Sequence, residues 1–95
     1  MYIVLLKFST NRDKVGLFMD GHKAWLQRGF DEGIFLLAGS LQPNLGGGIV
    51  AYNTSKSELQ DRVGEDPFVA ENVVRAEIIE IDPSRADERL AFLID

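Results

Sequence analysis

The stretch Tyr2-Ile3-Val4-Leu5-Leu6-Lys7-Phe8 decides the fold, because a short apolar run of this composition predicts a β-strand. Alternate residues of a strand point to opposite faces, and here both faces are apolar apart from Lys7. A strand in a sheet with one solvated face would alternate apolar with polar residues. This stretch therefore predicts a strand that is covered on both sides.

An amphipathic helix is predicted directly after this strand, over about residues 14–33. Apolar side chains recur at three- and four-residue steps from Val15 to Phe30, and most of the charged side chains fall between them. Gly33 is suited to end the helix, because glycine readily adopts the left-handed conformation found just beyond helix C-termini.

Two further strands are predicted in the middle of the chain. Residues 34–41 form a run that is apolar on both faces, with Phe35, Leu37 and Gly39 on one side and Ile34, Leu36 and Ala38 on the other. We expect a turn over Pro43, Asn44 and the run Gly46-Gly47-Gly48. Residues 49–52 then predict a third strand, antiparallel to the second.

The last third of the chain predicts a helix, a strand and a short helical tail. Ser55 and Glu58 have the spacing of a capping box, which starts a second helix that stops near Gly64. Residues 73–81 predict a fourth strand, and Ser84 is expected to cap a short C-terminal helix.

The resulting order, β-α-β-β-α-β, predicts one α+β domain over residues 1–95 with the ferredoxin-like arrangement. Right-handed crossovers place both main helices on one face of a four-stranded antiparallel sheet. The other face is then apolar and uncovered, and each exposed Leu or Phe that is buried there contributes about 1.5–3 kcal/mol. We therefore expect a homodimer that packs through the open sheet faces.

Composition excludes several classes of protein. The 95 residues include no cysteine, so neither a disulfide nor a zinc-thiolate site is available. A net charge of −5 argues against binding to nucleic acid, and no apolar run is long enough to span a membrane. The glycine run at 46–48 lacks the spacing of a phosphate-binding loop. We expect a cytoplasmic protein without cofactor or metal.

His22, the single histidine, is the first candidate functional residue. It lies on or beside the apolar stripe of the first predicted helix, with Phe18 four residues before it and Trp25 three residues after it. A histidine there is either packed into the core or directed into a cleft. In a cleft it could carry protons, because the ordinary pKa of histidine, about 6.5, lies close to neutral pH.

Asp66 is the second candidate, and it too has two interpretations. Asp before Pro67 is a favourable N-cap for one helical turn, which would be a purely structural role. Alternatively, its carboxylate pairs with His22, fixes the imidazole tautomer and frees the other ring nitrogen to act on a ligand.

Over nearly its whole length the chain resembles the YCII-related (YciI-like) family. The resemblance rests on the opening strand, on His22 followed by Trp25-Leu26, on the run Gly33-Ile34-Phe35-Leu36-Leu37-Ala38-Gly39, and on Asp66-Pro67-Phe68 before the last strand. It implies a ferredoxin-like fold, a dimeric α/β barrel, and an active site in which a histidine and an aspartate form a dyad. The matching positions here are His22 and Asp66.

The leading functional hypothesis is a cofactor-free, lyase- or isomerase-like enzyme that transfers protons on a small aromatic or cyclic acid. His22 would act as general base or acid, with Asp66 orienting it. We expect an apolar pocket lined by the substrate-binding residues Phe8, Phe18, Trp25, Ser40 and Phe68. One alternative is a dimeric binding or protein-interaction module without chemistry, in which His22 and Asp66 lie too far apart to hydrogen-bond. Another is haem-linked or oxygen chemistry.

Overall fold

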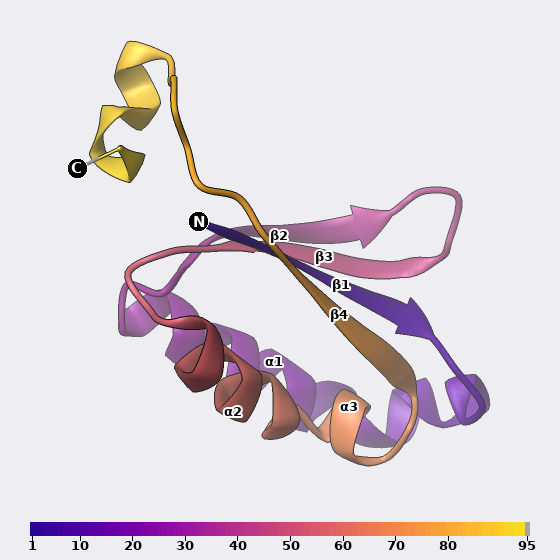
Figure 1. The fold of residues 1–95 in the computed structure, drawn as a ribbon. Coiled ribbons are helices and arrows are strands. Elements are labelled where there is room, and N and C mark those ends of the chain that lie inside the picture. Colours follow the sequence, from indigo (N-terminus) through magenta and orange to yellow (C-terminus); the bar gives the residue numbers. More distant parts are fainter. Residues whose placement is uncertain (95) are drawn as a thin grey trace.

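The computed structural model describes residues 1–94, and its strands and helices alternate much as the sequence predicts (Figure 1). The chain runs through β1 (Tyr2–Phe8), the 3-10 helix η1 (Arg12–Lys14), α1 (Val15–Asp31), β2 (Phe35–Leu41), β3 (Gly46–Ala51), α2 (Lys56–Gly64), α3 (Pro67–Ala70), β4 (Val74–Glu80) and the 3-10 helix η2 (Glu88–Leu93).

The four strands form one antiparallel sheet in the order β2-β3-β1-β4. The helices α1, α2 and α3 all lie on one face of the sheet, and the segment after β4 leads away from the body of the domain (Figure 1). This is the ferredoxin-like arrangement, so the predicted fold class is confirmed.

The core lies between the sheet and the helices. Alternate residues of β1, including Val4 and Leu6, are buried on this side, where they meet Trp25 of α1 and Leu59 of α2. A Cβ on Gly29 would overlap the ring of Phe35, so α1 crosses β2 closely only because residue 29 is glycine.

The glycine run at 46–48 is part of a strand, so the turn predicted there is wrong. All three glycines pair with β1, where Gly46 lies opposite Lys7 and Gly48 lies opposite Leu5. The turn is confined to residues 42–45, which precede β3. A glycine run is typical of turns because of its conformational freedom, but here all three glycines form part of the antiparallel pairing with β1.

The predicted faces of the second strand are also partly wrong. A bulge at residue 36 separates Phe35, which pairs with Ala51, from Leu37, which pairs with Val50. After the bulge it is Ala38 and Ser40 that share the helix-covered face, while Leu37 and Gly39 turn to the other face. The extra residue reverses the alternation that the sequence alone suggests.

Three of the four residues that the sequence places at helix ends are found there in the structure. Ser55 accepts a hydrogen bond from the Glu58 backbone N–H at the start of α2, as predicted, and Gly33 has a φ of 74° just beyond α1. Asp66 caps α3, with Pro67 at its first position. The C-terminal helix is capped by Asp87, so the predicted cap at Ser84 is wrong.

The second face of the sheet carries no helix within residues 1–94 (Figure 1). Its apolar side chains include Leu37, 57% exposed, and Ile79, 39% exposed. Elsewhere on the surface, Leu90 and Phe92 of η2 are also exposed, and Phe92 contacts the ring of Tyr52. In the part of the chain that the structure describes, no helix is both long and apolar enough to cross a membrane.

Candidate functional site

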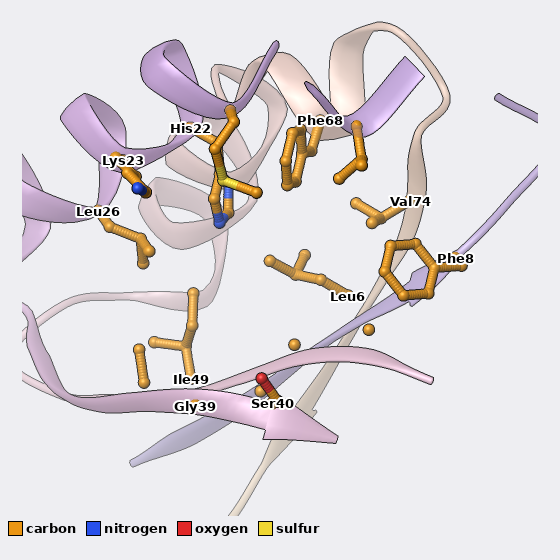
Figure 2. A pocket seen from close by; sticks show the side chains of 16 residues that line it. Leu6, Phe8, His22, Lys23, Leu26, Gly39, Ser40, Ile49, Phe68 and Val74 are labelled. Carbon is orange, nitrogen blue, oxygen red and sulfur yellow. The ribbon is translucent and has the colours of Figure 1, made fainter. Parts of the chain in front are cut away.

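A cavity of about 340 Å³ lies between α1 and the sheet, near the short helix α3 (Figure 2). Most of the side chains that line it are apolar. The lining residues are Leu6, Phe8, Val15, Met19, His22, Lys23, Leu26, Ala38, Gly39, Ser40, Gly46, Gly47, Gly48, Ile49, Phe68 and Val74. A volume near 300 Å³ is at the small end of ligand pockets, and suits a compound built on one ring.

One wall of the cavity is a stripe along α1. Val15, Met19, His22 and Leu26 follow one another at steps of four, three and four residues, which places them on the same side of the helix. The periodicity that builds the core thus also directs His22 toward the sheet.

The opposite wall is the sheet, where small residues leave the space open. Gly47 pairs with Leu6 on one side and with Ser40 on the other, and Ala38 pairs with Ile49. Paired residues of antiparallel strands share a face, so Ala38, Ser40 and Gly47 all face the helices. A larger side chain at any of these positions would extend into the cavity.

His22 and Asp66 meet beside this cavity. The Nδ1 atom of His22 lies 2.9 Å from Oδ1 of Asp66, although the two residues are 44 positions apart in the chain. Asp66 is fully buried, and the His22 side chain is 14% exposed. Because Nδ1 is engaged by the carboxylate, Nε2 is the ring nitrogen left for a ligand (Figure 2).

The position of Asp66 depends on α3. Its Oδ1 atom accepts a second hydrogen bond, 3.0 Å long, from the backbone N–H of Phe68, as an N-cap does. Its other oxygen, Oδ2, is buried and has no hydrogen-bond partner among the described residues. The carboxylate therefore combines both predicted roles, because the atom that caps the helix also holds the histidine.

The imidazole of His22 also packs against an aromatic ring. Phe68 stacks on His22 with ring centroids 4.1 Å apart and planes 7° from parallel. Trp25 lies on the same helix, with its ring centroid 5.8 Å from that of His22. The hydrogen bond to Asp66 and the stacked ring of Phe68 together restrict both the tilt and the rotation of the imidazole.

The structure places three of the five predicted substrate-binding residues at the cavity. Phe8, Ser40 and Phe68 line the cavity, whereas Phe18 and Trp25 do not. Trp25 is buried in the core, where its Nε1–H donates to the backbone carbonyl of Arg62, and Phe18 packs against the same core. Both lie on the apolar side of α1, but that side is wider than the strip of it that faces the cavity.

Sequence reasoning missed several residues of the cavity, namely Met19, Lys23, Leu26 and Ala38, and it placed Gly47 in a turn at the rim of a pocket instead of in a strand that forms its wall. Met19 and Leu26 could have been found, because they lie three residues before and four residues after His22. Gly47 could not, since its orientation depends on the pairing of β3 with both neighbours. Within residues 1–94, no three His, Asp or Glu side chains gather in a way that could hold a metal ion.

Comparison with known proteins supports the fold only. No protein-family model matches the chain, and no curated protein matches it either. Among solved structures, the chain is similar to 5-chloro-2-hydroxyhydroquinone dehydrochlorinase from Burkholderia phenoliruptrix, in complex with 2,5-dihydroxybenzoquinone. The TM-score is 0.68 and the identity 13%, over 85% of this chain and 93% of the other.

Proposed function

We propose that this chain is a YciI-like enzyme that transfers protons on a small aromatic or cyclic acid, by elimination or isomerisation, without a cofactor. The observation that carries the proposal is the contact of His22 with Asp66, 2.9 Å from Nδ1 to Oδ1, at the edge of an apolar cavity that the imidazole lines. A buried carboxylate on one ring nitrogen makes the other nitrogen a better base.

In the proposed reaction, Nε2 of His22 takes a proton from the substrate. In an elimination, the electron pair of the broken bond to hydrogen forms a double bond. The leaving group departs with the electron pair of the bond that joined it to the substrate. In an isomerisation, the imidazolium returns the proton to a different atom of the same molecule. Asp66 stabilises the imidazolium in both cases, because its charge lies against Nδ1.

The similar structure gives this proposal its first substrates to test. That protein removes chloride from a hydroxylated single ring, and it was solved with a dihydroxybenzoquinone. The cavity described above is of a size to take one such ring. Since the two chains share 13% identity, we use these compounds as probes of the reaction class.

We also propose that two copies pack through the open sheet face. Leu37 and Ile79 are exposed on that face, and the described part of the chain supplies nothing that covers them. Lys7 and Arg75 lie opposite each other at one end of the face, and Glu77 of the same face could pair with them from a second copy.

The experiment that tests the enzymatic proposal follows proton exchange and chloride release. The protein is incubated in D2O with single-ring acids, 5-chloro-2-hydroxyhydroquinone among them, and deuterium uptake is read by NMR. We expect turnover that falls by at least about 100-fold in His22→Gln, because glutamine cannot take the proton from the substrate.

Arg28→Met is the control, because it changes an exposed side chain of the same helix that lies outside the cavity. Its rate should stay within a few-fold of the unmodified protein. If His22→Gln is folded and retains full turnover, His22 is a structural residue. The separation of His22 from Asp66 that we expected of a non-catalytic module is wrong, because the two side chains are in contact. If every protein nevertheless binds the ring compounds without exchange or release, the chain is a binding module in spite of that contact.

A further inference from the structure

We propose that Lys23 determines the specificity of the cavity, by selecting ring compounds that carry a carboxylate or phenolate and rejecting their neutral counterparts. The inference rests on the proposed function, because it concerns the ligand of the same cavity. It names the side chain that recognises the acid, which neither the His22–Asp66 contact nor the shape of the cavity supplies.

Lys23 is set apart by the charges around it. It is the only Lys or Arg among the lining residues, and within residues 1–94 no Asp or Glu lines the cavity. The Asp66 carboxylate lies behind the His22 imidazole and is in contact with its Nδ1 atom, so it does not face the cavity directly. The Lys23 ammonium is therefore the positive charge of the described lining that can attract an anion.

The Lys23 ammonium is also free of ion pairs with the described residues. The three pairs found there are His22 with Asp66, Arg62 with Glu32, and Arg89 with Asp87. Asp20 lies three residues before Lys23 on α1, within reach for a helical pair, but none forms. A lysine without a partner beside an apolar cavity can bind an incoming anion without first losing another contact.

The place of Lys23 in the helix relates it to the imidazole. It follows His22 directly in α1, so it lies at the edge of the same wall (Figure 2). Among the described lining residues, Ser40 on the facing strand is the third with a hydrogen-bonding side chain, after His22 and Lys23. An acid group held at Lys23 would leave the ring of the ligand among the apolar side chains and within the part of the cavity that His22 lines.

The contribution of a contact between Lys23 and an acid group to affinity depends on how much water surrounds it. An ion pair on an open surface contributes little, because water screens it and two long side chains must be ordered. Once a ring fills the cavity, the apolar side chains of Leu26, Met19 and Ile49 exclude part of that water. Lys23 itself is exposed at the edge of the cavity, so the contact keeps part of its water, and we expect it to correspond to about a tenfold difference in affinity.

Two matched probes test the inference without requiring turnover. Benzoate and benzamide have the same ring and nearly the same shape, and differ in charge. Binding is followed by NMR of the His22 imidazole, which is unambiguous because the chain has a single histidine. We expect the unmodified protein to prefer benzoate about tenfold, with a preference that shrinks as salt is added.

Lys23→Met should reduce that preference to near one by weakening benzoate alone, and Lys23→Arg should restore most of it. Arg28→Met is the control, because it removes the same charge from an exposed position on the same helix outside the cavity. It should leave the preference unchanged.

Three results would overturn the inference. These are an unchanged preference in Lys23→Met, an equal loss in Arg28→Met, or no binding of benzoate by the unmodified protein in the millimolar range. A different combination of results would contradict the proposed function and leave this inference standing. Loss of the acid preference in Lys23→Met together with full turnover in His22→Gln would keep Lys23 as the specificity residue and remove His22 as the base.

Discussion

At the scale of single residues, the site depends on one carboxylate with two tasks. Oδ1 of Asp66 accepts from the Phe68 backbone N–H and also contacts Nδ1 of His22. Burial of a charged group is costly unless it is compensated, and here Oδ2 lacks a partner among the described residues. A helix start that needs only a cap could use an exposed Ser or Asp. The full burial of Asp66 is therefore better explained by its contact with the histidine.

Substitutions at Asp66 should separate these tasks. Asp66→Asn keeps an acceptor for the cap but removes the charge, so we expect turnover to fall at least tenfold with a small loss of stability. Asp66→Ala removes the cap as well and should lower the free energy of unfolding by about 2 kcal/mol. Urea unfolding and the rate assay together check this. Equal activity in Asp66→Asn and the unmodified protein would show that the charge has no catalytic role.

Tyr2 links the first strand to the pH dependence of stability. Burial, together with the charge of Glu80 opposite it in β4, raises the pKa of the Tyr2 phenol above its usual value near 10. The unfolded chain then loses this proton at a lower pH than the folded chain does. The free energy of unfolding should therefore fall as pH rises above about 10.

Tyr2→Phe should remove this part of the alkaline dependence, because phenylalanine has no proton to lose. Urea unfolding of both proteins measures the difference in their free energies of unfolding. The pH series extends from about two units below to about two units above the usual phenol pKa. Parallel curves for Tyr2→Phe and the unmodified protein would contradict the expectation.

At the scale of elements, the cavity depends on the small residues of β3. Its first half consists of glycines that serve different purposes. Gly46 has a φ of 134°, and a Cβ there would meet the backbone of Leu6. Gly47 has room, since an added Cβ would meet only the Gly39 carbonyl at 3.5 Å. Gly46 is thus required for the pairing of β1 and β3, whereas Gly47 is required only to keep the space beside His22 open.

Two substitutions in this strand should give opposite results. Gly47→Val should fold and keep its stability within about 1 kcal/mol, while its side chain fills the cavity and abolishes benzoate binding. Gly46→Ala should lose at least about 2 kcal/mol, because it combines a strained φ with a backbone clash. Thermal unfolding and ligand titration of both variants check this. Benzoate binding that survives in Gly47→Val would place the ligand elsewhere.

At the scale of the whole molecule, the sheet has one face covered by helices and one apolar face without cover in the described chain (Figure 1). A domain of this size gains little stability beyond its single core. Burial of the second face against another copy would add the apolar contacts that β1 and β2 already present on that side, including Leu5 and Leu37.

Leu37→Glu should therefore shift the proposed dimer toward monomer, because it places a charge within the proposed interface. Leu17→Glu is the matched control, since Leu17 is 74% exposed on α1, away from the sheet. Sedimentation velocity at matched concentrations measures both. A monomeric unmodified protein, or an equal shift in Leu17→Glu, would contradict the proposed interface.

The chain by itself determined the order of strands and helices, the caps at Ser55 and Asp66, and the apolar character of both faces of β1. These features are local, because they depend on side chains within a few residues of one another. The pairing of His22 with Asp66 was one of two interpretations that the sequence left open, and the contact of 2.9 Å between Nδ1 and Oδ1 favours it.

The surroundings of that pair depend on contacts between distant elements. The bulge at residue 36 turns Ala38 and Ser40 toward the helices, and the pairing of β3 with two neighbours turns Gly47 there too. The place of Lys23 at the cavity, and that of Trp25 in the core, follow from the packing of α1 on the sheet. Periodicity tells which side of a helix is apolar, but the meeting of distant elements decides which part of that side faces empty space.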